Sequence, residues 1–188
     1  MNGYLKASGI AKKPVVTLSG EAVAQVKDIV FDASRGSIRC FTLSGRGLLA
    51  GPLHQVLRWK NTHALGPDAV MVRNENALED QEAARTGDEG QDGGDILGSR
   101  MMTRSGTHLG SITDAVIATG KTPVVAGYEI ETAEHRRVLV PVTEPVTVSG
   151  DLVIVPDATA EHTAGDLAGL HNATEALREQ IRRAKQED

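Results

Sequence analysis

The sequence predicts an all-β chain of two tandem, small antiparallel β-barrels, followed by one C-terminal helix. Three observations support this prediction: part of the sequence recurs, short apolar runs alternate with turn residues, and helical periodicity is confined to the end of the chain. The chain has 188 residues, of which 40% are hydrophobic and 24% are charged. This composition provides enough apolar material for folded domains and argues against wholesale disorder.

The repeat consists of three pairs of segments in the same order. Residues 20–28 (GEAVAQVKD) match residues 106–114 (GTHLGSITD), each beginning with glycine and ending with aspartate. The other two matches are residues 38–43 with 125–130, and residues 68–72 with 151–155. We therefore predict a first module at residues 12–75 and a second at residues 96–157.

Each module is predicted to be a series of short strands. Apolar and β-branched runs are separated by Gly, Asp, Ser and Pro, which is typical of strands joined by turns. The runs are 15–17, 23–31, 38–43, 48–50, 56–59 and 69–72 in the first module, and 100–103, 109–117, 124–130, 138–140 and 152–155 in the second. Hairpin turns are predicted at residues 32–36 and 119–123. The gaps between runs are too short for crossover helices, so we expect antiparallel pairing, and barrel closure would remove most exposed edges.

The residues outside the modules differ in composition. Residues 76–95 are predicted to form a solvated, glycine-containing linker, because eight acidic residues between positions 75 and 95 are opposed by Arg85 alone. In the C-terminal segment, residues 158–188, a stripe recurs at spacings of three and four: Leu167, Leu170, Thr174, Leu177, Ile181 and Ala184. This spacing predicts an amphipathic helix from about residue 164 to about residue 185.

The second module carries a recognisable order of motifs. It has Gly106, Leu109, Gly110, Ile112 and Asp114, then Gly127-Tyr128, the run Val138-Leu139-Val140-Pro141, and the closing run Val153-Ile154-Val155. The first module repeats the order from Gly20 to Asp28 and on to Val70-Met71-Val72, but has Ala24 at the second glycine and an extra Ala50-Gly51 before Pro52. Because these motifs occur in the same order in both modules, the chain resembles the PRC-barrel family. That family is typified by the reaction-centre H subunit cytoplasmic domain and the C-terminal domain of the ribosome maturation factor. The resemblance implies small barrels that act through protein–protein contacts, with no defining set of catalytic residues.

The repeated acids Asp28 and Asp114 are the candidate polar site residues. Strand alternation places Asp114 on a face with Ile112 and Val116, and Asp28 on a face with Val26 and Val30. An acid on such an apolar face needs donors or a shifted pKa. We expect both to be structural acids that accept backbone N–H bonds from a neighbouring turn. The alternative is a catalytic carboxylate in a hydrolase or a small-ligand binder.

No metal or cofactor site is expected. The histidines show no metal-ligand spacing and are expected to be exposed: His54, His63, His108, His135, His162 and His171. Cys40, the single cysteine, excludes an intramolecular disulfide and is expected to fill a core. We therefore predict no catalytic residue, no cofactor and no metal.

The sequence favours a non-enzymatic protein-interaction adaptor in the cytoplasm. No apolar run reaches the roughly 18–20 residues of a membrane span, and the N-terminus lacks the pattern of a signal peptide. The alternative is an RNA- or ribosome-associated maturation accessory factor, although a net charge of −5 and 3% aromatic residues give no strong nucleic-acid signal.

The apolar stripe of the C-terminal helix is the candidate partner-binding surface: Leu167, Leu170, Leu177 and Ile181. We expect it to dock on the chain's own barrels, and the alternative is that it pairs with another chain. Because each module is small and marginal alone, we also expect the modules to pack together or the chain to form a homodimer, burying roughly 1,200–2,000 Å².

Overall fold

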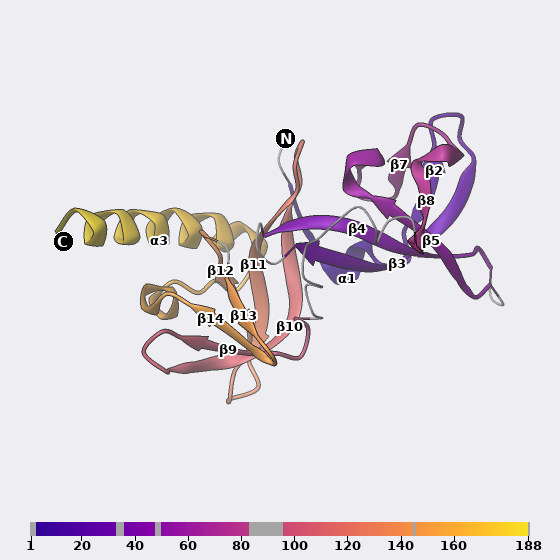
Figure 1. Cartoon of the computed structure of the whole chain (residues 1–188). Helices are drawn as coiled ribbons and strands as arrows, with labels where there is room; N and C mark the ends of the chain where they lie inside the picture. Colours follow the sequence, from indigo (N-terminus) through magenta and orange to yellow (C-terminus); the bar gives the residue numbers. More distant parts are fainter. Residues whose placement is uncertain (1–2, 33–35, 48–49, 83–95, 145, 188) are drawn as a thin grey trace. The chain divides into compact units, whose positions relative to one another are not determined.

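The computed structural model is mostly β with one long C-terminal helix (Figure 1). It describes residues 3–32, 36–47, 50–82, 96–144 and 146–187. These residues divide into two compact units. The N-terminal unit holds the described residues 7–32, 37–47 and 50–82, and the C-terminal unit holds 3–6, 36, 96–144 and 146–187.

The N-terminal unit is a sheet preceded by one short helix. Its elements are α1 (Ala7–Ile10), β2 (Pro14–Thr17), β3 (Ala22–Asp32), β4 (Ser37–Ser44), β5 (Pro52–Arg58), the 3-10 turn η1 (Trp59–Asn61), β6 (Thr62–Leu65), β7 (Val70–Val72), the 3-10 turn η2 (Glu75–Ala77) and β8 (Leu78–Asp80). The strands pair in the order β6-β7-β2-β3-β4-β5-β8. Most of the predicted strands of the first module are therefore present, while residues 48–49 of the predicted run 48–50 lie outside the described residues.

The C-terminal unit has the same plan with two additions. Its elements are β1 (Tyr4–Lys6), β9 (Arg100–Thr103), β10 (His108–Ala118), β11 (Val124–Glu131), β12 (Arg137–Pro141), β13 (Thr147–Ser149), β14 (Leu152–Val155), the 3-10 turn η3 (Asp157–Glu161) and α3 (Leu167–Glu187). The strands pair in the order β13-β14-β9-β10-β11-β12, and β1 pairs with the C-terminal part of β10. The additions are β1, from the start of the chain, and α3, from its end.

The prediction of antiparallel pairing throughout is wrong at one place in each unit. Strand β2 runs parallel to β7, and β9 runs parallel to β14. Parallel neighbours need a long connection, which is usually a helix, but here the connection is made by the intervening antiparallel strands. The described strand pairings form an open path in each unit, from β6 to β8 and from β13 to β12.

Two boundaries also differ from the predicted ones. Leu78–Asp80, placed in the acidic linker, form β8 and pair with β5, whereas the rest of that linker from residue 83 lies outside the described residues. The N-terminal unit starts before residue 12, because Ile10 of α1 is fully buried. Tyr4–Lys6 belong to the other unit, as a strand on β10.

The duplicated glycine turn has the same hydrogen bonds in both units. The N–H of Gly20 donates to the Thr17 carbonyl at 2.9 Å, and the N–H of Gly106 donates to the Thr103 carbonyl at 3.0 Å. Both glycines have a left-handed backbone, with φ of 89° and 92°, which residues with a Cβ rarely adopt. The glycine that opens each repeat is therefore required by the turn before β3 and β10.

Each unit has its own apolar core. The N-terminal core includes Val15, Val26, Phe41, Leu43, Leu57 and Val70, with Phe41 edge-to-face on Trp59 at 6.4 Å between ring centroids. The C-terminal core includes Met101, Ile112, Ile117, Ile130, Val140 and Val153. Cys40 is only half-buried, so it is not the core residue that was expected. Among the residues that the structure describes, no helix combines the length and apolar character needed to cross a membrane.

Candidate functional site

The two repeated acids occupy different environments. Asp114 is buried and accepts a hydrogen bond from the Ala115 N–H at 2.8 Å, as a structural acid would. Asp28 is exposed together with its neighbour Lys27, so the expectation of an acid on the apolar face is wrong for the first module. Each strand has a register shift immediately before its aspartate, and such a bulge breaks the strict alternation of faces.

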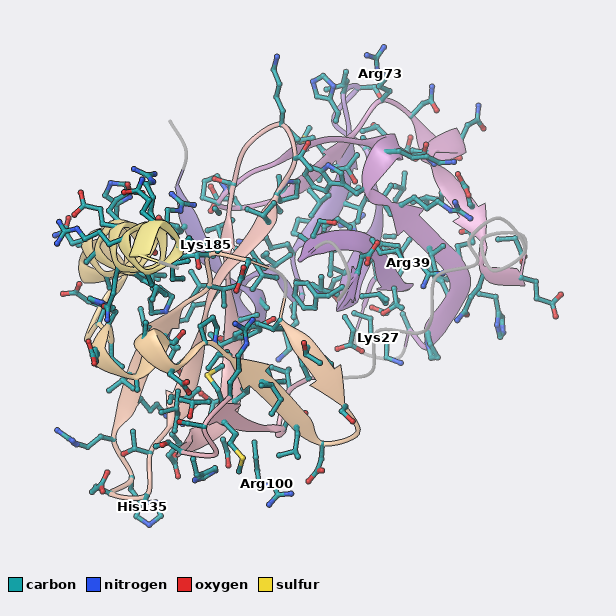
Figure 2. The ribbon with its side chains drawn as sticks, turned by 60° about the vertical axis from the view of Figure 1, so that its left-hand side comes forward. Lys27, Arg39, Arg73, Arg100, His135 and Lys185 are labelled. Atoms are coloured by element: carbon teal, nitrogen blue, oxygen red, sulfur yellow. The ribbon has the colours of Figure 1, made fainter. Side chains whose placement is uncertain are left out.

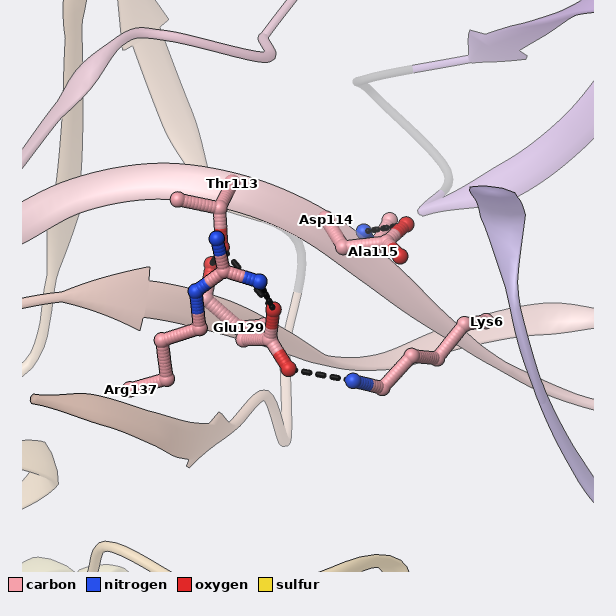
Figure 3. Close-up of polar contacts among 6 residues, drawn as sticks. All are labelled: Lys6, Thr113, Asp114, Ala115, Glu129 and Arg137. Carbon is pink, nitrogen blue, oxygen red and sulfur yellow. Dashed lines mark hydrogen bonds and ion pairs between the residues drawn. The ribbon is translucent and has the colours of Figure 1, made fainter. Parts of the chain in front are cut away.

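The C-terminal unit contains a second buried acid that the sequence did not single out. Glu129 lies in β11, paired directly with Asp114 of β10, and its side chain is only 9% exposed. Figure 3 shows its carboxylate between two cations, with Lys6 reaching it from β1 and Arg137 from β12. Lys6 forms an ion pair and hydrogen bond with one carboxylate oxygen, and Arg137 lies 3.7 Å from the other.

A hydroxyl completes the environment of Glu129. Thr113 Oγ1 donates to the Glu129 carboxylate at 3.1 Å and also lies 3.3 Å from its backbone carbonyl. Burial alone raises the pKa of Glu129, but the hydrogen bonds from Lys6 and Thr113 and the charges of Lys6 and Arg137 together outweigh burial. The pKa of Glu129 therefore lies below its ordinary value, and the group is ionised at neutral pH.

This cluster ties four strands together and offers little for acid–base chemistry. A carboxylate with a lowered pKa is a poor proton donor or acceptor near neutral pH. Its interactions connect β1, β10, β11 and β12, so they fix the first strand of the chain onto the C-terminal unit. We therefore assign a structural role to Glu129.

The candidate partner-binding stripe lies on α3, which docks on the chain's own C-terminal unit. The helix begins at a cap, since the Gly169 N–H donates to Asp166 Oδ1 at 2.7 Å. Just before it, Ala164 exchanges two backbone hydrogen bonds with Leu139 of β12, at 2.7 and 2.8 Å. The chain is thus anchored to β12 at the point where the helix starts, and α3 packs against β12 and η3.

Leu170 and Leu177 are buried where the helix docks. They are therefore not available to bind a partner, which was the candidate role of the stripe. Leu170 packs in a cluster with Val116, Leu139 and Ala164. It lies over Gly127, where an added Cβ would be 3.2 Å from its Cδ1 atom and 2.6 Å from a backbone carbonyl oxygen of β12. The glycine of the Gly127-Tyr128 motif therefore makes room for the helix.

The remaining two stripe residues are less buried. Leu167 and Ile181 are half-buried, and residues 182–186 at the end of the helix are exposed. Polar contacts hold the middle of the helix, because Gln180 bonds to both His162 and Glu161 beside η3. His162 is accordingly half-buried, while the other five histidines are exposed as expected.

No metal site is evident in the described part of the chain. None of its His, Cys, Asp and Glu side chains gather in a group of three or more that could hold an ion. The acidic residues from 83 to 95 lie outside that part.

Comparison with known families agrees with the duplication seen in sequence and structure. The PRC-barrel domain matches the chain twice, at residues 3–78 and at residues 90–162. The first match begins at residue 3, and the second ends beyond η3, just before the Ala164 anchor. No curated protein matches the chain.

Proposed function

Because the chain belongs to the PRC-barrel family, we propose that it is a non-enzymatic protein-interaction adaptor of the cytoplasm. The observation that carries this proposal is the tandem family match, which covers most of the chain with a domain that has no defining catalytic residues. The adaptor would present strand surfaces of its two units to a protein partner.

The environment of the buried acids supports the same proposal. Glu129 is neutralised by Lys6 and Arg137, and Asp114 accepts a backbone N–H of its own strand. Glu129 does accept a hydrogen bond from the Thr113 hydroxyl, but Lys6 and Arg137 help to hold its pKa below the ordinary value, which makes it a weak base near neutral pH. The hydrolase alternative built on Asp28 or Asp114 is correspondingly weakened, since Asp28 is exposed and belongs to the other unit.

We further propose that each unit is a small closed barrel. In both units, the buried residues of successive strands form one apolar core, as expected when a sheet curls around its own side chains. Closure would protect the two end strands of each path, so their amides should exchange slowly with deuterium. Rapid exchange along β6 and β13, at the rate of unpaired edges, would show open sheets instead.

The proposed function is tested by affinity capture of the tagged full chain from cytoplasmic extract, with and without nuclease. The adaptor proposal predicts a stoichiometric protein partner whose recovery is unchanged by nuclease. A matched Lys6→Met variant, altered at the structural cluster, should retain the partner as long as it remains folded. Recovery that depends on RNA would instead support the maturation-factor alternative.

A further inference from the structure

A polar pocket of about 420 Å³ lies in the N-terminal unit, which does not contain the Glu129 cluster. Lys60 and Arg73 bring positive charge to its lining, His63 brings an imidazole ring, and Asn61, Asn74 and Asn76 bring amide groups. Among the residues that the structure describes, no Asp or Glu lines the pocket, and His63 provides its one aromatic ring. A pocket with this lining suits a small anion better than an apolar ligand.

Two 3-10 turns and one hairpin build the walls of this pocket. The turn η1 brings Lys60 and Asn61, and the strand that follows brings His63. The pairing of β6 with β7 shifts register between Thr62 and Ala64, so His63 is the extra residue of a bulge. Bulges re-aim side chains and are frequent beside binding sites.

The amide side chains hold the second wall in place. Asn74 caps η2 by accepting a hydrogen bond from the Asn76 N–H at 3.1 Å. Asn61 Nδ2 donates to the Ala77 carbonyl at 3.1 Å and to Glu79 Oε1 at 2.7 Å, which links η1 to η2. With Asn74 Oδ1 engaged as an acceptor, the Nδ2 donors of Asn74 are left for a ligand.

The ammonium of Lys60 is shared with an acid beside the pocket. Glu79 lies 3.8 Å from Lys60 and 3.1 Å from Arg58, which does not line the pocket, so Arg73 supplies the positive charge that is left for a ligand. Arg73 is exposed and has no ion pair with any residue in the described ranges. Figure 2 shows Arg73 pointing outward from the ribbon, far from Lys27 on the same unit.

We propose that this pocket binds the phosphate group of a small phosphorylated molecule. A guanidinium such as that of Arg73 binds two phosphate oxygens at once, the Lys60 ammonium adds a point charge, and the Nδ2 donors of Asn74 complete the oxyanion shell. The volume lies within the range of small-molecule sites. A nucleic-acid strand would need a longer basic track with stacking aromatic side chains, which this lining lacks. The proposal does not depend on the adaptor role.

The test is an amide NMR titration of the full chain with glycerol phosphate, and separately with inorganic phosphate. Saturable shifts confined to residues 60–63 and 73–77 are expected, with glycerol phosphate the tighter ligand. Arg73→Ala should weaken binding about 10-fold, since one charge-assisted contact is lost from an exposed residue. Lys27→Ala, which removes an exposed cation elsewhere on the unit, should leave the affinity unchanged.

Three results would overturn the proposal. The first is a set of shifts that spread over the surface without saturating. The second is equal weakening by Arg73→Ala and Lys27→Ala, which would indicate general electrostatic attraction. The third is an RNA oligonucleotide that shifts the same residues at much lower concentration than glycerol phosphate. Fluorescence of Trp59, the single tryptophan, verifies that each variant is folded.

Discussion

Replacing Leu170 by alanine tests whether α3 is part of the fold of the C-terminal unit. The leucine side chain is fully buried against Val116, Leu139 and Ala164. Leu170→Ala removes the favourable free energy of transferring the leucine side chain from water to the core, and it leaves a cavity. We therefore expect the free energy of unfolding to fall by about 3 kcal/mol. Helix propensity cannot cause this loss, because alanine is the better helix former.

Hydrogen exchange measures the effect in the unit concerned. A loss of about 3 kcal/mol predicts roughly 100-fold faster exchange of the most protected amides of α3 and β12. Ile181→Ala is the matched control, and because Ile181 is half-buried near the end of α3 it should cost only about 1 kcal/mol. Unprotected α3 amides in the wild-type chain, or no change with Leu170→Ala, would refute the docking.

Three further predictions concern the C-terminal unit. Gly127→Ala should lower the unfolding midpoint in urea, because the new Cβ would lie 2.6 Å from a backbone oxygen, whereas Gly165→Ala meets nothing within 4 Å and should have little effect. Lys6→Met should cost about 1–2 kcal/mol at neutral pH, less than a fully buried pair because Lys6 is 38% exposed. The lowered pKa of Glu129 gives stability that is present above about pH 4.5 and lost as the pH falls further. The free energy of unfolding should therefore depend less on pH in this acid range for Lys6→Met than for the wild-type chain. Identical curves would contradict the assignment. Burial raises the pKa of Tyr128 from 10.0 to about 12. The contribution of its neutral phenol to the free energy of unfolding is therefore complete below pH 10.0 and falls by about 2–3 kcal/mol as the pH rises toward 12. Urea unfolding measures this loss, and Tyr128→Phe should not show it.

The strand pattern was predictable because it depends on local signals. Gly20 and Gly106 mark the same turn, and the apolar runs after them form β3 and β10. The parallel pairs β2–β7 and β9–β14 were not predictable in the same way, because the sequence of a strand does not indicate which other strand pairs with it. The three residues of β1 carry too little pattern to indicate that they pair with a strand more than a hundred residues away.

The candidate site was predictable only in part, for equally physical reasons. The period of the stripe through Leu170 and Leu177 indicated a helix, and docking was the favoured interpretation, although the period does not say which surface covers the stripe. Alternation along β3 predicted Asp28 on the apolar face, but Asp28 is exposed. A register shift precedes both Asp28 and Asp114, so the sequence pattern could not distinguish the two acids. Glu129 lies within a mainly apolar run. An acidic residue inside such a run was the one sequence feature that could have indicated a buried ion pair.

The most direct test of the adaptor proposal is the salt dependence of binding to the captured partner. We predict that the affinity changes little between about 0.1 M and about 1 M salt, because a mostly apolar protein contact releases few counterions. A steep fall in affinity over this range would contradict it, and a steep fall together with loss of the partner on nuclease treatment would support the RNA-associated alternative.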